Sequence, residues 1–147
     1  MSVKTGGCQC GRVRYVVETE KAQAYLCHCR MCQRATGGFA AAFVQVPPKA
    51  LSWESEPDWY QSSPIARRPF CSNCGTPLGF HFADGAGHPD ITFGSFDDPV
   101  GFAPEAHAGS ESLHEAWLNT GSLPRYTTAK TESVAKRWKA AGRGVPE

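Results

Sequence analysis

The stretch Cys71-Ser72-Asn73-Cys74-Gly75 carries two cysteines separated by two residues and followed by a glycine. This spacing lets both sulfurs face one metal ion while backbone amides turn toward them. The glycine permits the positive φ that such a turn often requires. Two ligands fill only half of a tetrahedral shell, so this stretch predicts a partner elsewhere in the chain.

A second cysteine pair, in Cys8-Gln9-Cys10-Gly11, has the same limitation, because it too supplies only two sulfurs. Together Cys8, Cys10, Cys71 and Cys74 can close a four-sulfur shell, which is typical of structural zinc. Such a site joins the N-terminal strand to the second half of the sheet. Zinc binding of this kind contributes about 10–16 kcal/mol in small peptides. We therefore expect these two pairs to hold the fold together.

Three further cysteines, Cys27, Cys29 and Cys32, are close enough in sequence to meet on one metal ion without help from elsewhere. Three protein ligands leave the fourth zinc position for water or substrate, as in catalytic sites. The alternative is a closed structural site with a histidine as fourth ligand. His28 sits between two ligands and should face away from the metal. The other histidines stay open as candidates: His81, His88, His107 and His114. The spacing favours the open site.

The composition narrows the classes of partner and compartment. The length of 147 residues favours a single domain over residues 1–147. Net charge is +1 and no long basic run occurs, so neither nucleic acid nor a membrane surface is expected as a partner. No segment resembles a membrane helix or a secretory signal, which predicts a cytoplasmic location. Disulfides are rare there, and seven cysteines is an odd number for a disulfide framework.

Short segments rich in β-branched and aromatic residues alternate with turn signals, which predicts a mainly β fold. Residues 12–18 are an example, with Val13, Tyr15 and Val17 on one face. The other candidate strands are residues 24–26, 40–46, 51–53, 78–82 and 91–93. One short C-terminal helix is predicted, from about Thr131 to Ala141.

Three cysteine motifs, in this order along the chain, carry a family resemblance. They are Gly6-Gly7-Cys8-Gln9-Cys10-Gly11-Arg12-Val13-Arg14-Tyr15, Cys27-His28-Cys29-Arg30-Met31-Cys32 and Cys71-Ser72-Asn73-Cys74-Gly75. With Trp117 and Leu123-Pro124, they resemble the glutathione-dependent formaldehyde-activating (GFA, or CENP-V-like) family. The resemblance extends over most of the chain.

This resemblance implies a fold of coiled β-sheets of the Mss4-like class and two zinc ions per chain. It assigns a structural zinc to the two cysteine pairs and a catalytic zinc to the triplet, the same division that the spacing favours. The family's name activity joins glutathione to formaldehyde, giving S-hydroxymethylglutathione, which is carbon–sulfur lyase chemistry in reverse. The implied partner is a small-molecule thiol such as glutathione.

A mechanism follows from the open position. A thiol bound to zinc loses its proton, and the thiolate is the nucleophile. Zinc can also polarise an incoming carbonyl group. The alternative function is a non-catalytic, zinc-stabilised β module that acts as a binding or interaction domain, with both metals structural. The occupant of the fourth position at the triplet distinguishes these two hypotheses.

Other residues give weaker signals. His28 and His81 are candidates for a general acid, although a structural histidine is the more common role. The pair Arg67-Arg68 could bind a glutathione carboxylate. An isolated pair of arginines is, however, more often exposed and solvated, which is what we expect here. Phe39 and Phe43 follow the triplet and could form the wall of a substrate pocket, whereas most aromatic residues are expected to pack in the core.

Overall fold

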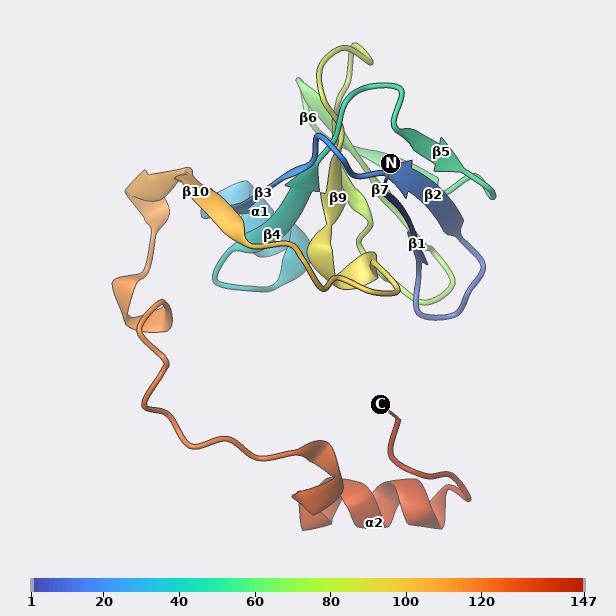
Figure 1. The fold of residues 1–147 in the computed structure, drawn as a ribbon, viewed down its shortest axis with the longest axis vertical. Coiled ribbons are helices and arrows are strands. Elements are labelled where there is room, and N and C mark those ends of the chain that lie inside the picture. The colour runs from blue at the N-terminus through green and yellow to red at the C-terminus, as the bar shows by residue number, and fades with distance from the viewer. Residues whose placement is uncertain (1, 147) are drawn as a thin grey trace. The chain divides into compact units, whose positions relative to one another are not determined.

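Two β-sheets provide most of the regular structure in residues 2–146, the part of the chain that the computed structural model describes (Figure 1). The smaller sheet is antiparallel, with the order β1 (Val3–Gly7), β2 (Arg14–Glu18), β5 (Leu51–Trp53). The larger sheet has seven strands, in the order β10 (Pro104–Ala108), β3 (Gln23–Cys27), β4 (Ala41–Gln45), β9 (Asp90–Thr92), β8 (Gly79–Phe82), β7 (Ala66–Phe70), β6 (Asp58–Ser63). Only the β10–β3 pairing is parallel within this range. The mainly β prediction is confirmed.

All the strands predicted from sequence are present, with ends that differ by at most two residues. Four strands were not predicted, namely β1, β6, β7 and β10. Each contains residues that are depleted in strands: β1 ends in Gly6-Gly7, β6 begins at Asp58, β7 contains Pro69, and β10 begins at Pro104. Their pairing depends on neighbouring strands rather than on local preference.

The core lies where the two sheets meet. Tyr15 and Val17 of β2 pack in one buried cluster with Val44 of β4 and Ile91 of β9. The Tyr15 hydroxyl is satisfied by a hydrogen bond of 2.9 Å with the side chain of Ser95. Because Tyr15 belongs to the smaller sheet and its neighbours to the larger one, this cluster fixes the two sheets against each other.

The helices differ from the prediction in one respect. The C-terminal helix α2 (Glu132–Ala140) agrees with the predicted one. A second helix, α1 (Arg30–Thr36), was not predicted and begins inside the cysteine triplet. Its seven residues are too few for a periodic pattern to show in sequence. No helix in residues 2–146 has the length and apolarity that a membrane span requires.

The chain divides into two compact units, one reaching Leu113 and one starting at His114. Both sheets and α1 belong to the first unit, and α2 belongs to the second. A division into compact units does not by itself show where an independently folding domain ends. The single domain over residues 1–147 therefore stays a prediction.

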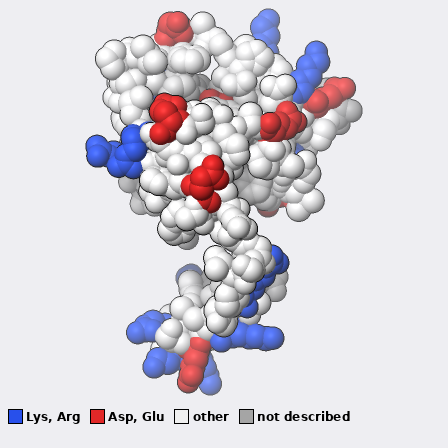
Figure 2. Space-filling model, turned by 90° about the vertical axis from the view of Figure 1, so that its left-hand side faces the viewer, with Lys and Arg blue, Asp and Glu red and all other residues white. Residues whose placement is uncertain are grey.

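Charged residues on the molecular face in Figure 2 are scattered over the β-rich unit, with acidic and basic side chains among uncharged ones. This distribution accords with the net charge of +1. A protein that binds nucleic acid through its backbone phosphates gathers Lys and Arg on one face. The visible face of the β-rich unit has no such gathering, and the partner class stays a prediction.

Candidate metal centres

Cys8, Cys10, Cys71 and Cys74 form a four-cysteine cluster, in which all sulfurs lie within 4.8 Å of one another. The sulfur–sulfur distance is 3.5 Å between Cys8 and Cys10 and 3.7 Å between Cys10 and Cys71. A tetrahedral zinc ion with Zn–S bonds of about 2.3 Å separates its sulfurs by about 3.8 Å. The four sulfurs therefore fit around a metal ion of this size.

Two similar turns present these sulfurs at the ends of β1 and β7. The amide of Gly11 donates to the carbonyl of Cys8 (3.1 Å), and the amide of Gly75 donates to that of Cys71 (2.7 Å). Gly75 has φ +80°, as the sequence predicted for a turn of this kind. The cluster thus connects the edge of the smaller sheet to the larger sheet.

Nearby groups stabilise negative charge on the four-cysteine cluster. The Arg12 guanidinium donates to the Cys71 sulfur (3.4 Å) and forms an ion pair with Asp58. A hydrogen bond with the Thr76 hydroxyl (3.2 Å) lowers the pKa of the Cys74 thiol to about 5. Thiolates are the form of cysteine that binds metals, so these interactions favour the binding of a metal cation at this cluster.

Cys27, Cys29 and Cys32 form a three-cysteine cluster, whose sulfurs also lie within 4.8 Å of one another. Cys27 ends β3, Cys29 is the N-cap of α1, and Cys32 lies in the first turn of that helix. The Cys32 amide donates to the Cys29 sulfur (3.3 Å), so the start of the helix holds two of the ligands in place. The Cys27 and Cys29 sulfurs are 3.5 Å apart. This cluster, too, could bind a metal ion.

The three-cysteine cluster lacks a fourth protein donor. Of the His, Cys, Asp and Glu side chains in residues 2–146, none adds a ligand atom within 4.8 Å of all three sulfurs. His28 is fully buried and forms a hydrogen bond of 2.8 Å with His107 through its Nε2 atom. The two clusters therefore differ as the spacing predicted, with four sulfurs in one and three in the other.

A family model for the glutathione-dependent formaldehyde-activating enzymes matches residues 3–112, which include both clusters. The chain belongs to this family. A protein of Schizosaccharomyces pombe, described as an uncharacterized lyase, is 31% identical over 80 residues. That match covers 54% of this chain and 58% of the relative, so the chain spans little more than half of the relative's length.

A solved structure shares the fold. The crystal structure of a Rhodobacter sphaeroides protein matches with a TM-score of 0.52 and 24% sequence identity. The match covers 71% of this chain and 98% of that protein. The GFA resemblance inferred from the cysteine motifs is thus confirmed at the level of family, and the β-rich architecture has an experimental counterpart.

Arg68 is the cation beside the three-cysteine cluster, and the expectation that it is solvated is wrong. It is only 4% exposed, and its guanidinium donates to the Cys32 sulfur (3.4 Å). The same guanidinium lies over the ring of Phe80, 4.9 Å from the ring centroid. Alternation along β7 places Arg68 on the buried face, whereas its neighbour Arg67 is exposed. The charge pattern in sequence gave no signal of this difference.

The pKa values of the Cys27 and Cys32 thiols are shifted in opposite directions. A hydrogen bond from Cys27, opposed by burial and supported by Arg68, lowers the pKa of Cys32 to about 5. The same bond and burial raise the pKa of Cys27. Of these two thiols, Cys32 is the one that more readily carries a negative charge, because the Arg68 guanidinium lies against its sulfur.

Asp90 is a buried carboxyl that sequence reasoning missed. Burial raises its pKa to about 7, while hydrogen bonds from Tyr25 and Gln45 oppose this rise. The charges of Cys32 and Arg68 also act on it. Asp90 lies at the start of β9, in a strand where an alternating pattern would predict an exposed polar residue.

The segment from β10 to Gly109 fixes the backbone of the triplet. The amide of His28 donates to the carbonyl of Ala108 (2.8 Å). Gly109 follows with φ +60°, and a Cβ atom at this position would lie 2.6 Å from the Cys29 nitrogen. Only glycine fits such a close approach with this backbone conformation. The triplet is thus held by residues far from it in sequence.

A pocket of about 110 Å³ adjoins the three-cysteine cluster through Arg68. Its wall includes Thr36 of α1, Tyr60 of β6 and Thr92 of β9. Phe43 and Phe80 belong to the apolar group around the cysteines. Phe43, predicted as the wall of a substrate pocket, is buried in this group and does not line this pocket; it lines a different one, with Tyr25 and Phe102.

Proposed function

We propose that this protein is a zinc-dependent carbon–sulfur lyase of the GFA type that activates a small thiol such as glutathione at the three-cysteine cluster. In this proposal Cys8, Cys10, Cys71 and Cys74 hold a structural zinc. A second zinc is held by Cys27, Cys29 and Cys32, which makes two per chain. The observation that carries the proposal is the set of three converging sulfurs with no fourth His, Cys, Asp or Glu donor in residues 2–146.

The comparisons support this reading of the site. The family is named for glutathione-dependent formaldehyde activation, and the fission-yeast relative is described as a lyase. The proposed reaction adds the thiol of glutathione to formaldehyde. A carbon–sulfur bond forms, the thiol proton passes to the former carbonyl oxygen, and the reverse reaction is a lyase reaction. A cytoplasmic location and the Mss4-like class of the fold belong to the same proposal.

Zinc at the three-cysteine cluster would lower the pKa of an incoming thiol and polarise a carbonyl oxygen. The chain itself supplies charge balance, because three thiolates around a divalent ion leave an excess negative charge, and the Arg68 guanidinium lies against one of them. The Phe43 and Phe80 rings pack against the cysteines, and this apolar packing limits the access of water, which strengthens these electrostatic interactions. The adjoining pocket offers room for part of a substrate next to a fixed cation.

Cobalt substitution tests whether a thiol can enter the three-cysteine cluster. With cobalt in both sites, addition of glutathione should change the ligand-field absorption of the three-thiolate site, because a fourth sulfur joins the metal. S-methylglutathione, which has no free thiol, is the matched control and should leave the spectrum unchanged. An unaltered spectrum at saturating glutathione would contradict the open site and favour two structural metals.

Replacement of Arg68 should weaken metal binding at the three-cysteine cluster without unfolding the protein. Arg68→Met keeps most of the side-chain volume but removes the cation next to the Cys32 sulfur. Loss of such an outer interaction typically reduces metal affinity or activity about 10–100-fold. Competition with a chromophoric chelator measures the affinity for each of the two zinc ions. The affinity for the ion at the three-cysteine cluster should fall about 10–100-fold. Arg34→Met, on the exposed side of α1, is the control, and an equal loss there would refute the role of Arg68.

A further inference from the structure

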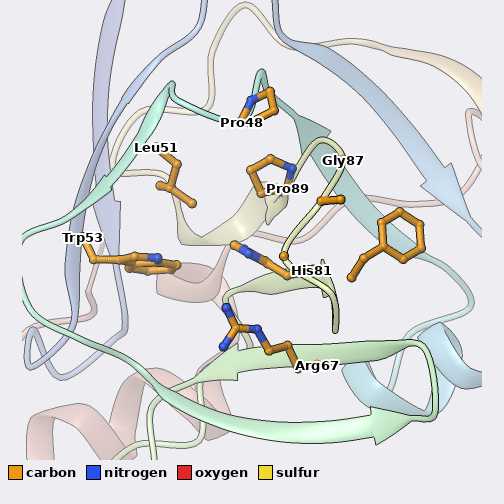
Figure 3. A pocket seen from close by; sticks show the side chains of 10 residues that line it. Pro48, Leu51, Trp53, Arg67, His81, Gly87 and Pro89 are labelled. Atoms are coloured by element: carbon orange, nitrogen blue, oxygen red, sulfur yellow. The ribbon is translucent and has the colours of Figure 1, made fainter.

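Figure 3 shows a second pocket, of about 130 Å³. It lies on the face of the β7–β8 hairpin opposite to the one that contacts the three-cysteine cluster. Arg67 of β7 and His81 of β8 are cross-strand partners and line this pocket together. Their neighbours Arg68 and Phe80 contact the other face, where Arg68 reaches the Cys32 sulfur. Because successive side chains of a strand point to opposite faces, the second pocket is separate from the candidate metal centre.

His81 contributes a polar atom without a partner. Its Nε2 atom is buried and has no hydrogen-bond partner among residues 2–146. Burial, with a contribution from Arg67, lowers the pKa of His81 to about 4, so the ring is neutral near pH 7. Trp59 packs edge-on against this ring, with 4.9 Å between the ring centroids. A buried polar atom left unpaired is unfavourable, and a ligand that forms a hydrogen bond with it removes this cost.

Arg67 contributes a positive charge that is held in place but not neutralised. Its guanidinium lies over the Trp59 ring, 4.2 Å from the ring centroid. It forms no ion pair with any acidic side chain in residues 2–146. The residues that line the pocket include no Asp or Glu either. A stacked guanidinium presents its N–H groups in a fixed fork that matches a carboxylate.

Apart from Arg67 and His81, the residues that line the pocket are glycines or have largely apolar side chains. In Figure 3, His81 lies between Arg67 on one side and the side chains of Leu51 and Pro89 on the other, with Trp53 beside them. The volume far exceeds the roughly 10–15 Å³ that a single water molecule requires. A small organic molecule with one charged end and one apolar end therefore matches this arrangement better than a metal ion or a polyanion.

We propose that this pocket binds a small-molecule monocarboxylate, with the carboxylate on Arg67 and on the Nε2–H of His81 and the apolar body against Trp53 and Leu51. A single fixed cation beside a neutral imidazole favours one negative charge. The site is distinct from the three-cysteine cluster, and the proposal does not depend on the reaction proposed there. It gives the chain a second ligand site on the other face of the same hairpin.

Benzoate is a suitable probe, with benzamide as its uncharged counterpart. Titration of the zinc-loaded protein is followed in ¹⁵N-resolved NMR spectra of the Trp indole and His side chains. We expect saturable binding at one site, with the largest shifts at Trp53 and His81, and at least about tenfold weaker binding of benzamide. Equal responses to the two compounds, or shifts confined to residues near the cysteines, would refute the proposal.

Two variants locate the charge that binds the probe. Arg67→Gln removes an exposed guanidinium from β7, so the fold should persist, and benzoate affinity should fall by about tenfold or more. Lys49→Gln removes an exposed cation next to Pro48 that does not line the pocket, and it should leave the affinity unchanged. An unchanged affinity in Arg67→Gln, or an equal loss in both variants, would show that the pocket is not the site.

Discussion

A Cys71→Ser variant is expected to lose the native fold. Cys71 is fully buried at the end of β7, and its sulfur lies 3.7 Å from that of Cys10, which is 61 positions away in sequence. Structural zinc contributes about 10–16 kcal/mol in small peptides, and the stability of a whole domain is about 5–15 kcal/mol. Breaking the four-sulfur shell is therefore expected to remove a free energy of the same size as the whole free energy of unfolding of the domain.

Circular dichroism, zinc content and resistance to limited proteolysis are the measurements for Cys71→Ser. The purified variant should show a flattened near-ultraviolet spectrum, at most one zinc per chain, and rapid cleavage within the β-sheets. Asn73→Ser, an exposed change in the same turn, is the matched control and should behave as the parent protein. A Cys71→Ser protein with the parent's unfolding midpoint would show that the four-cysteine cluster does not stabilise the fold.

A Cys29→Ser variant is expected to fold but to lose the proposed thiol-adduct chemistry, by more than about 100-fold. Loss of an outer partner of a metal ligand reduces activity about 10–100-fold, so loss of a ligand itself should exceed this range. The fold should persist for two reasons. The cluster closes only a short loop, and serine is itself a favourable N-cap, so the start of α1 keeps an acceptor for the Cys32 amide.

The exchange rate between free formaldehyde and S-hydroxymethylglutathione, measured by NMR, reports the activity of Cys29→Ser. Met31→Ser changes an exposed residue of the same helical turn and should keep the parent rate. Zinc content should fall from two to one per chain in Cys29→Ser and should stay at two in Met31→Ser. Full activity in this variant would refute the mechanism, and unfolding as complete as in Cys71→Ser would refute the division of roles between the clusters.

The cysteine motifs were the part of the sequence from which most could be predicted. Ligand spacing is a local property, so Cys8-x-Cys10, Cys71-x-x-Cys74 and the triplet could be sorted into a group of four and a group of three. The structure brings these same groups together. Strands with alternating apolar residues, such as β2, were also predictable, because one face of each packs in the core.

The surroundings of the three-cysteine cluster could not be predicted in the same way. Arg67 and Arg68 are adjacent and identical in type, yet one is exposed and the other contacts Cys32. The difference depends on the register of β7 in a hairpin whose strands lack an apolar pattern. Asp90 is likewise buried through pairing with β4 and β8, and these contacts are made between segments far apart in sequence.

The close contact between Gly109 and Cys29 can form only late in the synthesis of the chain. All seven cysteines precede residue 75, whereas the glycine that closes over Cys29 is 80 positions after it. At about 5–20 residues per second, this segment leaves the ribosome about 4–16 s later. In that interval the nascent triplet lacks both the Ala108 carbonyl, which accepts the hydrogen bond of the His28 amide, and the Gly109 backbone that covers Cys29. We therefore expect its thiols to be most accessible to oxidants and to metal ions before residue 109 has been synthesised.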